Sequence, residues 1–137
     1  MNKALKKITI PFLKAKGFKG SLPHFRRLQE DCYDLMTFQF DKYGGGFVIE
    51  MAQCAITGIV TSWGEKIPPE KAKAYQVSNR RDDVNPKYEN ARLRPQKDKD
   101  YWFRYDYFVE TEAYSKLAEQ VNSMINLHAE NWFRRKR

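Results

Sequence analysis

The chain has 137 residues, of which 42% are hydrophobic and 15% aromatic, and its formal net charge is +8. These values indicate one globular domain over residues 1–137 and argue against a disordered chain. No stretch has the length of a membrane span, and the basic N-terminus lacks the apolar core of a signal peptide. Because the cysteines are Cys32 and Cys54 alone, we expect two reduced thiols in a cytoplasmic protein that does not enter a membrane.

The positive charge is concentrated in two parts of the chain. Residues 1–30 contain eight Lys or Arg against one acid, and residues 80–104 contain eight against five. Such a field attracts polyanions or acidic proteins at long range, and salt screens it. The field alone does not choose between these partners.

The N-terminal segment has helical periodicity. Leu5, Ile8 and Phe12 follow helical spacing and predict the buried stripe. Pro11 predicts a kink or the start of a second helical part, and Gly17 predicts the end of the helix.

From Phe25 to Cys54 the period changes to two, which predicts an antiparallel meander of three strands. These strands are "HFRRLQ", "CYDLMTFQF" and "FVIEMAQC", and the glycines of "DKYGGG" suit the hairpin loop between the last two. No Lys-Ser/Thr pair and no helix follow this glycine run, so a phosphate-binding loop is disfavoured. The expected core positions are Phe38, Phe40, Phe47, Ile49 and Met51.

The middle of the chain predicts little regular structure. The stretch "TSWGEKIPPEKAKAYQV" begins with turn residues and allows at most a short helix after Pro68-Pro69. The stretch "SNRRDDVNPKYEN" has no apolar period, and we expect it to be an exposed loop.

Residues 101–109 alternate as a strand does. The odd positions, which we expect to face the core, are Tyr101, Phe103, Tyr105, Tyr107 and Val109. Arg104 and Asp106 share the other face, where they partly neutralise each other.

Residues 111–137 predict the clearest helix, with Thr111 as its N-cap. The apolar stripe of this helix is Tyr114, Leu117, Ala118, Val121, Met124, Ile125, His128 and Trp132. The closing "RRKR" fits the negative end of the helix dipole, and a nuclear-localisation signal is the less favoured interpretation.

Together these elements predict an α+β domain. An antiparallel sheet, made of a three-stranded meander and at least one later strand, packs against N- and C-terminal helices. The helices are expected to cover one face of the sheet and to leave the other face partly open.

The sequence contains no evident catalytic constellation. His128 falls on an apolar stripe, and His24 has no neighbouring serine or cysteine. Asp41 and Glu50 lack the following lysine that a metal-dependent nuclease needs, and no Cys/His spacing suits zinc. An enzyme is therefore the minority interpretation, and no metal or cofactor is expected.

Three stretches resemble a bacterial family catalogued as domain of unknown function 4304: "LKAKGFKG…HFRR", "GIVTSWGEKIPPEKAKAY" and "ARLRPQKDKDYWFRYD". The resemblance covers nearly the whole chain, and its most specific pieces are Ser62-Trp63-Gly64, Arg92-Leu93 and Trp102-Phe103. It implies an α+β domain with an antiparallel sheet packed against terminal helices. It implies no activity.

Basic and aromatic residues within these stretches are the candidates for a ligand-binding surface. They are Arg26, Trp63, Arg92, Arg94, Trp102 and Arg104. A guanidinium both stacks on tryptophan and holds a carboxylate through paired hydrogen bonds. We give more weight to the alternative, in which such side chains tie a loop to the sheet.

The expected function is that of a non-enzymatic binding or regulatory module that recognises another protein, for example in a toxin-immunity setting. The alternative is binding of RNA or single-stranded nucleic acid through a basic and aromatic surface. Against nucleic acid, the late aromatic rings follow core alternation, and lysines on an exposed helix are usually just solvated. A protein partner is therefore favoured.

Overall fold

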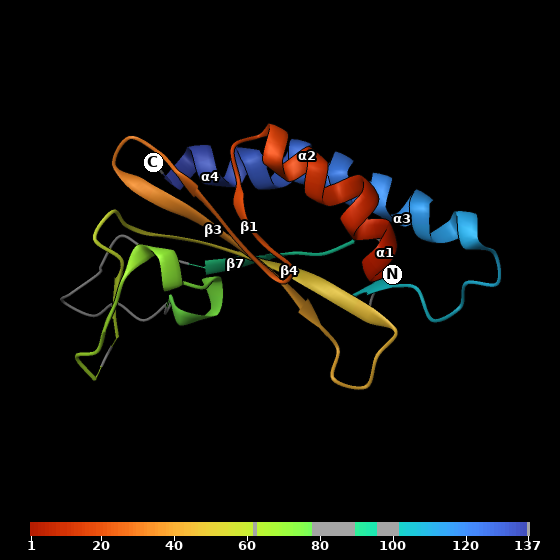
Figure 1. Ribbon diagram of the computed structural model, residues 1–137, viewed down its shortest axis with the longest axis horizontal. Coiled ribbons are helices and arrows are strands. Elements are labelled where there is room, and N and C mark those ends of the chain that lie inside the picture. Colours follow the sequence, from red (N-terminus) through yellow and green to blue (C-terminus); the bar gives the residue numbers. More distant parts are fainter. Residues whose placement is uncertain (62, 78–89, 96–101, 137) are drawn as a thin grey trace.

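The computed structural model describes residues 1–61, 63–77, 90–95 and 102–136, with the backbone alone for 135 and 136. The helical elements (Figure 1) are α1 (Asn2–Ala4), η1 (Leu5–Thr9), α2 (Ile10–Ala15), η2 (Pro69–Lys71), η3 (Ala74–Gln76), α3 (Thr111–Met124), η4 (Ile125–Ala129) and α4 (Glu130–Lys136). The strands are β1 (Lys19–Ser21), β2 (His24–Leu28), β3 (Cys32–Phe40), β4 (Gly46–Ala55), β5 (Ile59–Val60), β6 (Lys66–Ile67), β7 (Asn90–Leu93) and β8 (Phe103–Arg104). Elements η1 and η4 are π-helical turns within longer helices, whereas η2 and η3 are 3₁₀ turns.

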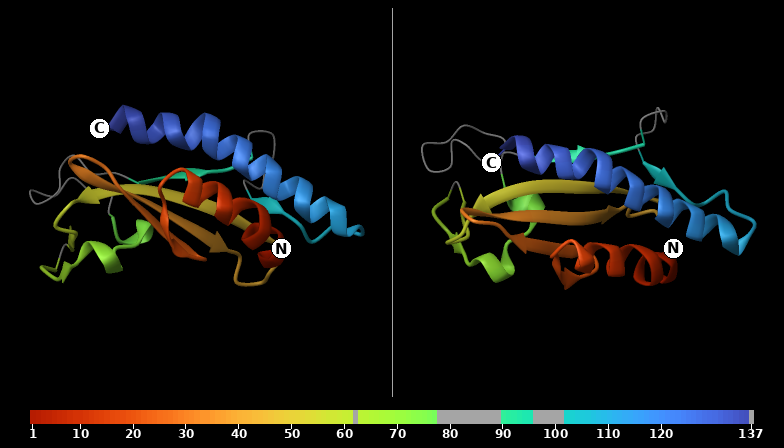
Figure 2. Two further views of the ribbon diagram at one scale, coloured as in Figure 1. Left: turned by 45° about the horizontal axis from the view of Figure 1, so that its top comes forward. Right: turned by 90° about the horizontal axis from the view of Figure 1, so that it is seen from above.

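The two terminal helices cover the same face of an antiparallel sheet. The strand order is β1-β2-β3-β4-β7, and β8 also pairs with β4. Figures 1 and 2 show the two helices side by side on this sheet and running in the same direction. Thr9 Oγ1 donates to the Ala118 carbonyl at 3.4 Å, and Asn122 Nδ2 donates to the Ile8 carbonyl at 3.2 Å. The predicted α+β class and the sheet packed against terminal helices are confirmed.

The main core lies between the helices and the sheet. The predicted core positions pack here, and those that are fully buried are Phe38, Phe47, Ile49 and Met51. Phe40 is half-buried against them. The rings of Phe47 and Phe103 stack with 5.1 Å between their centroids, which joins β8 to the same core.

The N-terminal helix buries residues at a spacing of four, namely Leu5, Thr9 and Leu13. Ile8 and Phe12, predicted on the buried stripe, are half-buried. The π turn η1 widens the helix locally, so the stripe advances by four residues rather than by alternate threes and fours. As predicted, Pro11 lies at the start of the second helical part, and Gly17 with φ +93° ends the helix.

The C-terminal helix is present as predicted, but its stripe shifts. The buried residues are Leu117, Ala118, Val121, Ile125, Ala129 and Phe133. The prediction is wrong for His128, which is exposed, and Trp132 is half-buried. The π turn η4 again favours a spacing of four, which places Ala129 and Phe133 inward. The N-cap is Glu110 and not Thr111, which is the first helical residue.

The segment before this helix differs most from the prediction. Phe103 is buried, but β8 ends at the next residue, and Tyr107 and Val109 are 75% and 97% exposed. The Tyr105 N–H donates to the Gly45 carbonyl, and the Phe108 N–H then donates to the Tyr105 carbonyl, which closes a turn. The turn removes the later residues from the sheet, and Tyr105 stays half-buried. Tyr101 lies outside the described residues.

The described residues 56–61 and 63–77, which we call the 56–77 cover, fold onto the sheet face opposite the terminal helices, which we call the far face. The second core cluster under this cover is Leu35, Ala52, Cys54, Ile59, Ala72, Ala74 and Val77. The short helix expected after Pro68-Pro69 is present as two 3₁₀ turns. The β5–β6 hairpin and strand β7 were not predicted. The predicted loop at 78–89 lies outside the described residues.

Candidate functional site

A row of polar side chains crosses the far face of the sheet. The strand register pairs His24 with Thr37, and Thr37 with Glu50. It also pairs Glu50 with Arg92, so the row runs from β2 to β7. The His24 Nδ1 and Thr37 Oγ1 atoms are 2.9 Å apart, and an Nη2–H of Arg92 donates to Glu50 Oε1 at 3.3 Å. Side-chain alternation puts this row opposite the terminal helices, beside the 56–77 cover.

A surface groove extends from the 56–77 cover to this row. Its larger part, about 1050 Å³, is lined by the 61–77 segment and Asn90 and includes Trp63 and Tyr75. Its smaller part, about 190 Å³, lies between Tyr75, Asn90, Glu50 and Arg92. Because Tyr75 and Asn90 line both parts, the two hollows adjoin. We call this surface the Trp63–Arg92 groove.

Two aromatic side chains present their rings to this groove. Trp63 is 76% exposed in the turn between β5 and β6, and its Nε1–H donates to Glu65 Oε2 at 3.1 Å. The Glu65 N–H donates in turn to Thr61 Oγ1 at 2.9 Å, which fixes the turn. Tyr75 is 57% exposed, and its ring centroid lies 6.2 Å from that of His24. Both rings are therefore held in position and remain accessible.

Arg92 closes the other end of the groove. Its side chain is 45% exposed, whereas the Glu50 carboxylate that accepts its hydrogen bond is 10% exposed. Among the residues that the structure describes, Glu50 is the one that accepts a hydrogen bond from this guanidinium. A guanidinium has several N–H donors in a planar fork, so Arg92 retains capacity for a ligand.

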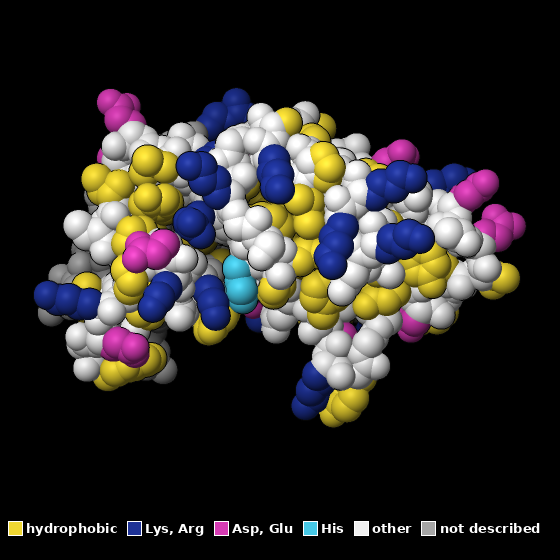
Figure 3. Space-filling view, viewed as in Figure 1, with side chains coloured by type: hydrophobic (Ala, Val, Ile, Leu, Met, Phe, Trp, Pro, Cys, Tyr) yellow, Lys and Arg dark blue, Asp and Glu magenta, His cyan; other side chains and the backbone are white. Residues whose placement is uncertain are grey.

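The described lining of the groove has slightly more cations than anions, namely Lys66, Lys71, Lys73 and Arg92 against Glu50, Glu65 and Glu70. Within the described parts of the chain, Lys66, Lys71 and Lys73 form no ion pair, although all three line the groove. Burial and the Lys73 ammonium lower the pKa of His24 below its ordinary value. Figure 3 shows Lys and Arg side chains spread over this view of the molecule, between hydrophobic areas. The groove therefore has a small excess of positive charge, and its three lysines are available to an acidic ligand.

Three of the predicted site residues gather at this groove. Trp63 and Arg92 line its two ends. Arg26 lies at its rim, because its Nη1–H donates to the carbonyl of the groove residue Glu70 at 3.5 Å. Arg26, Trp63 and Arg92 are far apart in the sequence, and the fold brings them to one surface.

The other three predicted residues lie outside the lining of the groove, on β8 or directly beside β7 and β8. Arg104 on β8 pairs with Gly46 across the strands, and its Nη1 is 3.8 Å from Asp41 Oδ2. Arg94 follows β7 and Trp102 precedes β8, and both are half-buried. Neither Arg94 nor Trp102 is brought to the groove.

The family of the chain is decided by a match to a family model. The model described as Domain of unknown function (DUF4304) matches residues 8–135. The chain belongs to this family. The resemblance predicted from the three sequence stretches is therefore confirmed. A search of the curated proteins and a search of the solved structures found no match.

This DUF4304 chain also has a buried polar cluster that sequence reasoning missed. Arg27 donates to Asp34 at 2.8 and 3.0 Å, to Glu130 at 2.7 and 3.0 Å, and to the Lys16 carbonyl at 3.3 Å. Its guanidinium carbon lies 4.3 Å from the centroid of the Phe18 ring. These bonds use the full set of guanidinium donors. Arg27 is therefore a structural lock between sheet and helices, with no donor left for a ligand.

The row also brings the His24 ring to the Thr37 hydroxyl. The contact of His24 with the Thr37 hydroxyl was missed because the partner lies on the neighbouring strand. Thr37 is 5% exposed, so its oxygen is shielded from a substrate. Within the described residues, no group of three His, Cys, Asp or Glu side chains could hold a metal ion.

No helix in the same part of the chain has the length and apolar character to cross a bilayer.

Sequence reasoning also missed Tyr75 and the role of Glu50 at the groove. A signal for Glu50 was present, since it is a carboxylate between Val48 and Ala52 in a strand that is otherwise largely apolar. A buried acid of this kind requires a partner. Tyr75 gave no such signal, because its position depends on how the 3₁₀ turns pack on the sheet.

Proposed function

We propose that this protein is a non-enzymatic module that recognises another protein, and that the Trp63–Arg92 groove is its binding surface. The observation that carries the proposal is a groove of about 1050 Å³ with two accessible rings, Trp63 and Tyr75, on its lining. Trp, Tyr and Arg are the side chains that most often dominate binding energy at protein interfaces. An immunity-type role, in which binding alone blocks the partner, needs no catalytic group and fits this proposal.

The character of the groove favours a protein over a nucleic acid. Its lining mixes the carboxylates of Glu65 and Glu70 with lysines, whereas a groove that follows a nucleic-acid backbone is basic along its length. The alternative also needs accessible rings on the sheet to stack bases. Phe103, in the most aromatic stretch, is buried in the core and cannot serve in this way. A protein segment with acidic and flat side chains suits the mixed lining better.

The test is capture of the partner from the native host with three versions of the protein. We expect the wild type to retain a protein after nuclease treatment and Trp63→Ala to lose it, because the substitution removes an exposed ring without disturbing the core. Tyr43→Ala is the matched control, since Tyr43 is 86% exposed on the β3–β4 hairpin, outside the groove.

Two results contradict the proposal. One is capture that nuclease abolishes, which indicates a nucleic-acid ligand. The other is equal capture by the wild type and the Trp63→Ala variant, which removes the groove from the interaction.

A further inference from the structure

We infer that the Arg92 end of the groove recognises a carboxylate, carried by an Asp or Glu side chain of the partner close to a flat residue that packs at the Trp63 end. This inference rests on the proposed function and names the chemical group that the groove selects.

The first argument is the way in which Arg92 is held. It lies on β7, paired in register with Glu50 on the central part of β4, so a regular element fixes its position. A single hydrogen bond of 3.3 Å to the nearly buried Glu50 carboxylate orients the guanidinium. The remaining donors of the planar fork match the two oxygens of a carboxylate.

The second argument is the size and charge of this end of the groove. The hollow of about 190 Å³ between Tyr75 and Arg92 suits the head of one side chain rather than a folded element. Glu50 cancels most of the net charge of Arg92, so recognition depends on paired hydrogen bonds more than on field strength. Paired hydrogen bonding of this kind fits the two oxygens of a planar carboxylate.

The third argument is the continuity of the surface. Tyr75 lines both hollows, so a ligand whose carboxylate contacts Arg92 passes directly over this ring. Lys73, on the same lining, is without an ion pair among the described residues and adds to the attraction for an acidic segment. A short acidic stretch with one flat side chain therefore fills both parts of the groove.

The experiment measures the affinity of an acidic peptide of glutamate, tyrosine and glycine, and of a matched peptide with glutamine in place of glutamate. Fluorescence anisotropy gives the dissociation constants for the wild type and for Arg92→Gln, Arg134→Gln and Trp63→Ala. Arg134→Gln is the charge-matched control, because Arg134 is exposed on α4 in the helix layer.

We expect the wild type to prefer the glutamate peptide by about tenfold, as for a charge-assisted hydrogen-bonded pair. Arg92→Gln should remove most of this preference, whereas Arg134→Gln should preserve it. Such coupling between the ligand carboxylate and Arg92 is the signature of direct contact.

Other outcomes separate the inference from the proposed function. If Trp63→Ala weakens binding but Arg92→Gln keeps the full preference for glutamate, the inference is overturned and the proposed function stands. If neither substitution changes the affinity of either peptide, or neither peptide binds, both are overturned. An oligothymidylate that displaces the acidic peptide and depends equally on Arg92 also overturns the preference for a carboxylate.

Discussion

Arg27 joins three parts of the chain through one guanidinium. Asp34 on β3 is fully buried, and Glu130 at the start of α4 is partly buried, so both carboxylates depend on this partner for compensation. The guanidinium carbon of Arg27 also lies 4.3 Å from the centroid of the Phe18 ring and 5.5 Å from that of Phe133. This lock needs a guanidinium on the sheet face that the helices cover, which is where strand alternation places Arg27.

We predict that Arg27→Ala lowers the free energy of unfolding by about 3–5 kcal/mol, because it leaves a buried carboxylate without its counter-charge. Urea unfolding measures this loss. Arg134→Ala, an exposed control on α4, should change the value by less than about 0.5 kcal/mol. A loss from Arg27→Ala as small as the one expected for the control would show that the cluster adds nothing to stability.

His24 is predicted to titrate below its ordinary pKa of 6.5, because burial and the Lys73 ammonium both disfavour its charged form. The unfolded state therefore takes up the proton first as pH falls. The stability that the neutral ring contributes is complete above about pH 6.5, and it decreases as the pH falls below that value. NMR titration measures the His24 midpoint, and Lys73→Gln should raise it. A His24 titration midpoint at or above pH 6.5 would contradict this prediction.

Cys54 is predicted to be an unreactive thiol. Burial, the nearby Cys32 and Asp34 raise the pKa of Cys54 to about 12. Because Cys54 pairs with Tyr33 across the strands, alternation puts Cys32 and Cys54 on opposite faces of the sheet. Thiol counting of the denatured, unreduced protein should find two free groups, and alkylation near neutral pH should be much slower in the folded state. Finding no free thiol would refute this prediction.

At the scale of elements, the π turns set the phase of both terminal helices. An ideal α-helix repeats about every 3.6 residues, which places His128 and Trp132 inward. The turn η4 instead carries the buried stripe from Ile125 to Ala129 and Phe133. The sequence pattern alone does not reveal this phase, because both stripes contain apolar residues.

We predict that Phe133→Ala lowers the free energy of unfolding by about 3–5 kcal/mol, as for a fully buried aromatic side chain. Leu127→Ala is the control in the same helix, because Leu127 is largely exposed, and it should cost far less. Thermal or urea unfolding distinguishes the two. A larger loss from Leu127→Ala would contradict the observed phase of the helix.

The strands that could be predicted from sequence are those with local signals. Strands β2, β3 and β4 alternate over many residues and are joined by short turns, so their pairing follows from neighbouring sequence. Strands β5, β6 and β7 have two to four residues each, too few for a period. Strand β7 forms only because β4 offers it an edge. The same applies to β8, whose alternation continues in sequence after the chain has turned away.

Sequence reasoning proposed three residues that meet at the candidate groove, Arg26, Trp63 and Arg92, but it did not predict the shape of the groove. Trp63 and Arg92 stand out as costly residues within specific motifs. Their meeting on one groove depends on the 56–77 cover folding back over the far face, which no local pattern specifies. Arg94, Trp102 and Arg104 have the same chemical character, but the strand pairing leaves them outside the lining of the groove.

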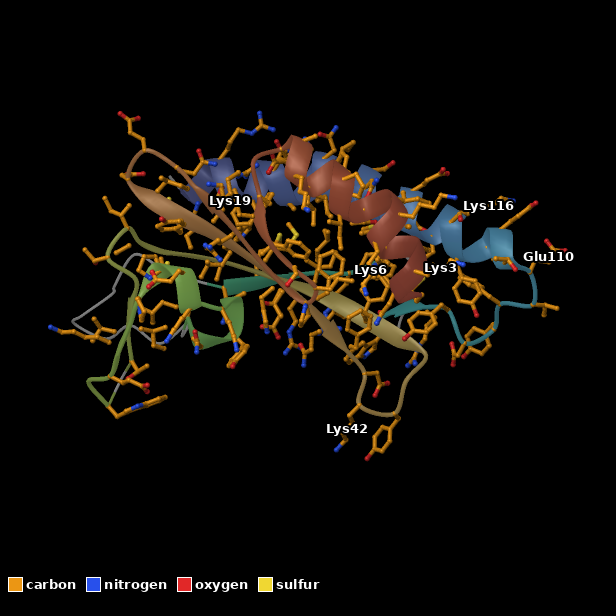
Figure 4. All side chains as sticks on the ribbon, in the orientation of Figure 1. Lys3, Lys6, Lys19, Lys42, Glu110 and Lys116 are labelled. Carbon is orange, nitrogen blue, oxygen red and sulfur yellow. The ribbon has the colours of Figure 1, made fainter. Side chains whose placement is uncertain are left out.

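At the scale of the whole molecule, two surfaces are candidates for binding the acidic partner that we propose. One is the Trp63–Arg92 groove on the far face. The other is the basic helix layer, where Lys3, Lys6 and Lys116 lie near the N-terminal end of the molecule (Figure 4). The helix layer offers charge on solvated side chains, whereas the groove combines charge with exposed rings and a fixed guanidinium. Specific binding is therefore expected at the groove.

The most direct test of the groove as the binding surface is an NMR chemical-shift map during titration with the acidic peptide of glutamate, tyrosine and glycine. We predict that the largest changes fall on residues 59–77 and 90–93, including the Nε1–H of Trp63, and that they persist at physiological salt. Changes that concentrate on the lysines of the helix layer and disappear as salt is added would contradict the account. So would the absence of any change at the groove while the peptide binds.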